Sequence, residues 1–413
     1  MRKLNSILLG AFVLGAMVEA LAVEPGLKDS SSAAKPVVVG EQAKKIHREC
    51  LLIDGHNDLP WQFRKKEDMS FLKYDLRKSI PALHTDIPRL KLGGVGAQFW
   101  AAYVPVESQK KGTAVKDTLE QIDVINRMVK SYPDEFEFAR TADDIIRIRK
   151  SGKIACMIGV EGGHSIDNSL GVLRSFYQLG ARYMTLTHSE NTDWADSCTD
   201  EPKNNGLSRF GEDVVREMNR LGMMVDISHV SPATMRHAIR VSSAPVIASH
   251  SSARGIADHP RNVPDDVLRL VKENKGVVMV NFYPGFVSPE GASRWNEVIR
   301  VYREYRKKYP VESDFQTALG QWRKQNPAPK ANIYQVADHI EHIIKVAGYD
   351  HVGIGSDFDG IESVPFQLED VSCYPKLTQV LLDRGHKEES IRKILGLNLL
   401  RVMRDVESVA NKK

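Results

Sequence analysis

Residues 51–60 read "LLIDGHNDLP", a short apolar run that ends in His56, Asp58 and Pro60. An apolar run without alternation indicates a strand buried on both faces, which is typical of a parallel sheet. Side chains two positions apart on a strand point to the same side, so His56 and Asp58 face one direction. The stretch therefore predicts a buried parallel strand whose end presents two metal-binding side chains.

The same pattern, a buried apolar run followed by polar residues or glycine, recurs along the chain. Further apolar runs that end in polar residues or glycine lie at 96–103, 154–163, 181–190, 222–231, 244–252, 276–284 and 351–360. Helical patterns lie between them, and those at 170–180, 211–222 and 336–348 each close on a glycine, as helices often do. Eight strands alternating with helices predict an α/β fold, a (β/α)8 TIM-type barrel, with an open doubly wound sheet as the alternative. The charged stretch 288–333 is predicted to be a helical insertion before the eighth strand.

The first 44 residues differ in composition from the rest of the 413-residue chain. Residues 1–22 have a basic start, an apolar run at 7–18 and small residues at Ala20 and Ala22, which are the features of a secretory signal peptide removed before Val23. A retained membrane anchor is the alternative, although the run is shorter than the roughly 20 residues that a spanning helix needs. Residues 23–44 are small and polar and predict a flexible leader. We expect an exported, periplasmic or secreted protein whose residues 45–408 form the barrel domain.

The chain's 57 lysines and arginines nearly balance its 53 aspartates and glutamates, and the charges are spread along the sequence. This distribution argues against nucleic acid as a partner. The cysteines are Cys50, Cys156, Cys198 and Cys373. An oxidising compartment allows a disulfide, but four thiols permit three full pairings and the sequence does not choose among them. Cys156 lies in an apolar run and is expected to be a small buried hydrophobic side chain.

Side chains able to bind metal stand at the ends of most predicted strands. They are His56, Asp58, Glu161, His188, His229, His250 and Asp357. The carboxyl ends of barrel strands converge on one mouth, where the active site lies. A single histidine at a strand end is more often a hydrogen-bonded loop residue, but a ring of such side chains predicts a metal site. Imidazole and carboxylate donors without cysteine favour catalytic zinc over a closed structural site.

Two neighbouring metal ions need a bridging carboxylate, and Glu161 is the candidate. His56 and Asp58 can reach one ion together. His229 and His250 would complete the second.

Eight segments carry a family resemblance. In chain order they are LLIDGHNDLP, GVEGGHSID, TLTHSENTDWAD, DISHVS, VIASHSSARG, RNVPDDVL, VNFYPG and GSDFDG. The chain resembles the membrane dipeptidase (renal dipeptidase) family, zinc-dependent barrel enzymes of the amidohydrolase superfamily, from about residue 45 to 405. The resemblance implies a homodimer and a centre of two Zn²⁺ per chain. It implies His56, Asp58 and Glu161 on one ion and Glu161, His229 and His250 on the other.

The resemblance also implies roles for the remaining residues. Glu161, His188 and Asp357 would be catalytic, with His188 at the developing oxyanion and Asp357 handling the proton passed to the leaving amine. Substrate would be bound by His188, Arg261 and Asp357, and the planar fork of Arg261 suits a terminal carboxylate. Strand phase cannot choose between the two aspartates of GSDFDG, and the resemblance selects Asp357 over Asp359. Glu190 stands where animal cell-surface relatives would carry a cysteine, and no lipid-anchor tail is expected, so membrane attachment is not carried over.

These observations lead to the hypothesis of a metallo-dipeptidase that hydrolyses dipeptides to free amino acids with zinc and tolerates a D-residue at the C-terminal position. The alternative is a related metal-dependent amidohydrolase acting on acylated amino acids, lactones or cyclic amides, and Arg261 is the feature that discriminates between them. A binding protein that has lost its chemistry would lack metal ligands, and none is missing.

Overall fold

The computed structural model describes residues 34–65, 71, 74–327 and 329–410. The expected signal peptide at 1–22 lies outside these residues, as does the first half of the expected leader, 23–33. Helix α1 (Glu41–Glu49) begins inside the segment for which a flexible leader was predicted. None of the described helices is long and apolar enough to cross a membrane.

Eight parallel strands form a closed barrel. They are β1 (Leu52–Asn57), β2 (Val95–Tyr103), β4 (Ile154–Glu161), β5 (Ala181–Thr185), β6 (Met224–Asp226), β7 (Ile247–Ala248), β8 (Val277–Val280) and β9 (Val352–Ile354). The hydrogen-bonded order runs β2-β1-β9-β8-β7-β6-β5-β4, and pairing of β2 with β4 closes the ring. Every predicted strand segment overlaps one of these strands. The predicted TIM-type barrel is confirmed, and the open doubly wound sheet is wrong.

A ninth strand was not predicted from the sequence. Residues Phe136–Phe138 form β3, which pairs in parallel with the first residues of β4. This strand is three residues long and only its first residue is fully buried, so it carries no apolar run.

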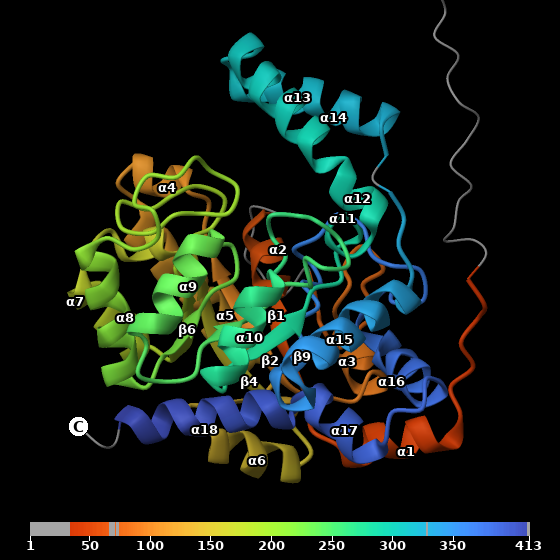
Figure 1. Ribbon diagram of the computed structural model, residues 1–413. Coiled ribbons are helices and arrows are strands. Elements are labelled where there is room, and N and C mark those ends of the chain that lie inside the picture. Colours follow the sequence, from red (N-terminus) through yellow and green to blue (C-terminus); the bar gives the residue numbers. More distant parts are fainter. Residues whose placement is uncertain (1–33, 66–70, 72–73, 328, 411–413) are drawn as a thin grey trace, which may run out of the picture.

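Helices surround the barrel (Figure 1). Besides α1 they are α2 (Leu59–Lys65), α3 (Ile87–Leu92), α4 (Glu107–Lys110), α5 (Ala114–Ser131), α6 (Ala142–Lys150), α7 (Leu170–Gln178), α8 (Arg209–Leu221), α9 (Pro232–Val241), α10 (Asp265–Glu273), α15 (Ile333–Ala347), α16 (Tyr374–Asp383), α17 (Glu388–Arg392) and α18 (Asn398–Ala410). Many of these helices have a side chain that caps their N-terminus, for example Ser231 for α9 and Asn332 for α15. The Cys156 side chain is fully buried in β4 as expected, and all four thiols are free.

The barrel interior is a packed core. Ile53, Phe99, Met157, Tyr183 and Met279 fill it, and Leu399 and Met403 of α18 join the same cluster of buried side chains. In Figure 1, α18 and α6 lie below the strands, at the opposite end from α4 and α13. The interior is therefore solid at this lower end, and a substrate site is expected at the other.

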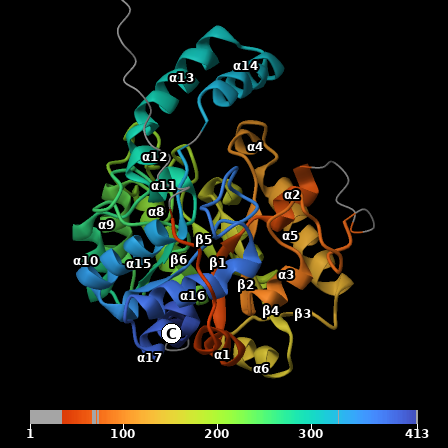
Figure 2. The ribbon, with the colours of Figure 1, turned by 90° about the vertical axis from the view of Figure 1, so that its right-hand side faces the viewer.

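The predicted helical insertion before the eighth barrel strand is confirmed. After α11 (Pro284–Val287) come α12 (Pro289–Ser293), α13 (Trp295–Lys308) and α14 (Glu312–Gln325), which we call the helical arm. Figures 1 and 2 show α13 and α14 standing out from the barrel body at the end opposite α18. The arm has a small core of its own, in which Val301, Phe315 and Leu319 are buried.

Candidate active site

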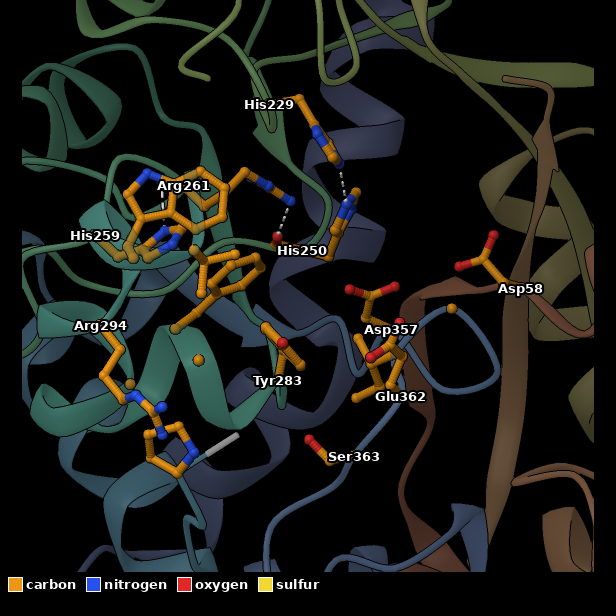
Figure 3. A pocket seen from close by; sticks show the side chains of 18 of the residues that line it. Asp58, His229, His250, His259, Arg261, Tyr283, Arg294, Asp357, Glu362 and Ser363 are labelled. Atoms are coloured by element: carbon orange, nitrogen blue, oxygen red, sulfur yellow. Dashed lines mark hydrogen bonds between the residues drawn. The ribbon is translucent and has the colours of Figure 1, made fainter. Parts of the chain in front are cut away.

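The seven predicted strand-end side chains converge at one end of the barrel. His56 and Glu161 stand on β1 and β4, and Asp58 follows β1 directly. His188, His229, His250 and Asp357 lie in the loops that follow β5, β6, β7 and β9. All except the buried His56 line one cavity of about 590 Å³, part of which appears in Figure 3.

Glu161 lies between two groups of ligands. Its Oε2 is 3.5 Å from His56 Nε2, which is itself 3.1 Å from Asp58 Oδ2. Its Oε1 is 3.1 Å from His229 Nε2 and 3.5 Å from His250 Nε2. The two histidine nitrogens lie 2.9 Å apart (Figure 3). Each carboxylate oxygen therefore faces a different group, as a carboxylate shared by two metal ions must.

The hydrogen bonds of His56 and His250 show which ring nitrogen of each histidine carries the proton. Tyr183 donates its hydroxyl proton to Gly55 O at 3.2 Å, so His56 Nδ1, 2.8 Å from the Tyr183 oxygen, is the donor in that contact. His56 Nε2 then carries a lone pair, and it is buried without a hydrogen-bond partner. A neutral imidazole whose buried, unprotonated nitrogen lies next to carboxylates is better suited to bind a metal ion than to remain in a polar cluster without one.

His250 is oriented in the same way. Ser249 Oγ donates to Asp226 Oδ2 at 2.6 Å, so His250 Nδ1 donates to Ser249 Oγ at 2.7 Å. Donor atoms of His56, Glu161 and His250, and those of Glu161, His188 and His229, lie within 4.8 Å of one another and fit a divalent cation of the zinc type.

Two buried aspartates that support the site were not identified from the sequence. Asp226, at the end of β6, accepts hydrogen bonds from Thr185, Ser228 and Ser249. Asp54 in β1 accepts from Ser356, Tyr374 and the backbone of His56. An aspartate inside an otherwise apolar strand, in "LLID" and "MMVDIS", is the signal that would have revealed both.

Backbone conformation also fixes the site. His229 and Asp357 have φ values of 65° and 67°, in the left-handed region that non-glycine residues rarely adopt. Such conformations persist where surrounding structure enforces them, and they cluster at functional sites. Gly360 has no such strain, but a Cβ there would collide with the carboxylate of Asp58.

Protonation states follow from burial and neighbouring charges. Burial alone would raise the pKa of Glu161, but the imidazoles of His56, His229 and His250 around its carboxylate hold it well below its usual range. Burial raises the pKa of Asp357 to about 8, and the negative charges of Asp58 and Glu161 add to the rise. Asn281 donates to Asp357 Oδ2 at 2.8 Å. Asp357 is therefore suited to hold a proton near neutral pH.

Arg261 is a buried guanidinium at the pocket wall. It donates to Ser251 Oγ at 3.3 Å and to His250 O at 3.1 Å, and its Cζ lies 5.2 Å from the centre of the Phe286 ring. No carboxylate of the described residues pairs with it within 4.0 Å. An exogenous carboxylate is the natural partner for such a group.

His188 stacks on His229, with 4.3 Å between ring centroids, and its Nε2 lies 3.6 Å from Glu161 Oε1. Burial lowers the pKa of His188 to about 4, so its ring is neutral.

The two aspartates left open by strand phase differ in position. Asp357 lines the pocket, whereas Asp359 accepts a hydrogen bond from the backbone of His84 at 2.7 Å. Glu190 pairs with Lys110 at 2.7 Å.

Comparison with known proteins agrees with this geometry. The model of a family described as membrane dipeptidase (peptidase family M19) matches residues 40–413. The chain is 42% identical over 381 residues to Dipeptidase verJ of Clonostachys rogersoniana, with 90% of this chain and 88% of that protein covered. It is 43% identical over 377 residues to Dipeptidase 3 of Mus musculus, with 90% and 68% covered.

Solved structures share the fold. The probable dipeptidase PvdM from Pseudomonas aeruginosa aligns with a TM-score of 0.78 at 24% identity, covering 89% of this chain and 98% of that chain. A metallo peptidase from Rhodobacter sphaeroides, liganded with a phosphinate mimic of the dipeptide L-Ala-D-Ala, aligns with a TM-score of 0.72 at 24% identity, covering 86% and 99%.

Proposed function

The chain belongs to the membrane dipeptidase family, peptidase family M19, and on that premise we propose that this metallo-dipeptidase hydrolyses dipeptides to free amino acids with two zinc ions. The proposal is carried by one observation. Glu161 stands between two groups of metal-binding side chains in the same cavity as Arg261, a buried guanidinium to which no described carboxylate is paired.

The proposed ligands are His56, Asp58 and Glu161 for one ion and Glu161, His229 and His250 for the other. Zinc in such a site polarises the carbonyl to be cleaved and lowers the pKa of water. Tyr183 and Ser249 hold the imidazoles of His56 and His250 with the metal-facing nitrogen unprotonated. The chain's own residues thereby fix the donor atoms before substrate arrives.

Three further side chains act on the substrate in this proposal. Arg261 binds the terminal carboxylate and fixes the position of the peptide bond. His188 stabilises the negative charge that develops on the carbonyl oxygen. Asp357, whose pKa burial raises to about 8, gives its proton to the departing amine nitrogen.

The wider assignment includes tolerance of a D-residue at the C-terminal position, export from the cytoplasm and a homodimer. A phosphinate mimic of L-Ala-D-Ala occupies one solved structure of the same fold, so Ala-D-Ala is a suitable test substrate. The basic start and apolar run of residues 1–22 support export. The resemblance to the family supports the homodimer.

Turnover of a dipeptide panel, with metal content determined on the same preparation, tests the function. We expect cleavage of Ala-Ala and Ala-D-Ala with about two zinc ions per chain, loss with a chelator and recovery with zinc. Cleavage of an N-acylated amino acid without dipeptide turnover would move the function to a related amidohydrolase.

A further inference from the structure

The helical arm forms part of the wall of the catalytic cavity. Arm residues that line it are Arg294, Trp295, Val298, Trp322 and Arg323. Trp295 and Val298 are half-buried and stand three positions apart on α13, so they share one face of the helix. The arm therefore contributes to the space that a substrate occupies, although it supplies no predicted metal ligand.

Arg261 determines which end of a dipeptide meets this wall. The backbone N–H of Arg261 donates to His259 Nδ1 at 3.1 Å, and the His259 ring lies 4.4 Å from the Trp295 ring and 4.5 Å from the Phe286 ring, measured between centroids. Figure 3 shows Arg261 and His259 side by side at the wall. The terminal carboxylate of a dipeptide is attached to the Cα that carries its last side chain. A carboxylate held by Arg261 thus places that side chain against these aromatic rings.

The two arginines of the arm that line the cavity already have partners. Arg294 donates to Pro327 O at 2.7 Å and lies 3.8 Å from Glu297. Arg323 pairs with Glu362, in the loop after β9, at 2.6 Å. What remains for a substrate side chain is the aromatic and aliphatic surface of Trp295 and Val298, where burial of apolar area is favourable.

We infer that Trp295 and Val298 of the arm, together with Phe286, form a subsite for a bulky apolar side chain at the C-terminal position of the dipeptide. This inference rests on the proposed function and deepens it. It makes the preferred substrates dipeptides that end in residues such as leucine or phenylalanine.

Two matched substrate series test the subsite with the zinc-loaded full-length enzyme. One series is Ala-Ala, Ala-Leu and Ala-Phe, and the other is Leu-Ala and Phe-Ala. The wild-type enzyme should cleave Ala-Leu and Ala-Phe with a kcat/KM about tenfold or more above that for Ala-Ala. Trp295→Ala should remove this preference, so that kcat/KM for Ala-Leu and Ala-Phe falls to about the value for Ala-Ala.

Further variants separate the subsite from general damage to the arm. Val298→Phe should also remove the preference, because it fills the same space. Trp295→Phe, which keeps an aromatic ring, should retain most of the preference. Tyr302→Ala removes an aromatic side chain of the same helix that packs against Phe315 of the arm core and lies outside the cavity lining, and it should leave the preference unchanged.

The outcomes distinguish the inference from the proposed function. An equal loss on all five dipeptides in Trp295→Ala would show that Trp295 acts on Arg261 through His259, and would overturn the subsite. A loss of turnover in Trp295→Ala that is confined to Leu-Ala and Phe-Ala would overturn the subsite as well. Turnover by the wild-type enzyme without any C-terminal preference would overturn the inference alone, whereas absence of all dipeptide turnover would overturn the function with it.

Discussion

The hydroxyl of Tyr183 shows how one side chain inside the barrel can orient a proposed metal ligand. It contacts His56 Nδ1 at 2.8 Å, and its ring packs against Phe99 at 5.0 Å. Tyr183→Phe keeps the ring and removes only the hydroxyl. We expect zinc affinity at one position to fall about 10- to 100-fold with the fold unchanged, as measured by competition with a chromogenic chelator.

Ser249→Ala is the matched change for the second position, because Ser249 supports His250. Each of the two variants should weaken the binding of one of the two zinc ions. Unchanged affinity for both zinc ions in Tyr183→Phe would show that this hydrogen bond does not orient the ligand.

The role proposed for Arg261 is recognition of a free carboxylate. Arg261→Met keeps length and packing against Phe286 but removes the charged hydrogen bonds. Each such bond is worth about 1.5–3 kcal/mol, so kcat/KM for a dipeptide should fall about 10- to 100-fold or more. Steady-state kinetics on a dipeptide and its C-terminal amide give the test. The amide is the internal control, and an equal loss on both compounds would contradict the assigned role.

Helix α15 is tied to the barrel loops by a neutral histidine. His339 accepts from Ala253 N at 3.0 Å and donates to Val287 O at 3.0 Å. Burial lowers the pKa of His339 to about 4, below the value of 6.5 for an exposed histidine. The unfolded chain therefore takes up the proton first as pH falls, and stability that is complete above pH 6.5 is lost between pH 6.5 and 4.

His339→Gln keeps a donor and an acceptor but cannot titrate. Urea unfolding at pH 7.5 and at pH 4 should show that the wild-type protein loses about 3 kcal/mol more unfolding free energy than the variant. Identical pH dependence in the two proteins would mean that His339 is solvated or protonated in the folded state.

The strands show which elements sequence reasoning can find. β6 and β7 contain only three and two residues, yet both were found because their apolar runs lead into "DISHVS" and "ASHSS". β3 was missed because its "FEF" has neither length nor a reactive end. The supporting aspartates Asp54 and Asp226 were missed for a different reason. Each interrupts an apolar strand and could have been noticed, but partners such as Ser356 and Ser249 come from other parts of the chain, and the sequence does not reveal which hydroxyl will face which carboxylate.

At the scale of the whole molecule, the proposed metal ligands join elements far apart in the chain. They come from β1, from β4 and from the loops after β6 and β7. A bound ion that links these elements stabilises the folded state by mass action, by about 2.7 kcal/mol when its free concentration is a hundred times its dissociation constant. Chelation should lower the thermal midpoint and zinc should restore it, as followed by calorimetry.

His56→Ala serves as the control for chelation, because its midpoint should respond less to the chelator and its activity should be absent. A midpoint that chelator leaves unchanged in the wild-type protein would show that the barrel holds these side chains together without metal.

The sequence predicted the barrel, the convergence of the strand-end side chains and the insertion, since each depends on local pattern or on the order of strands. It did not predict where the arm would point. Contact of Trp295 with His259 depends on how α12 and α13 turn after β8, and that is set by packing between segments rather than by periodicity.

The arm's separate core has a consequence for how such an enzyme changes over generations. Val301, Phe315 and Leu319 form a cluster in the arm that is separate from the proposed metal ligands. Mutations on its pocket-facing surface can therefore accumulate without touching the catalytic groups. Substrate range can drift in descendants while the chemistry is inherited unchanged.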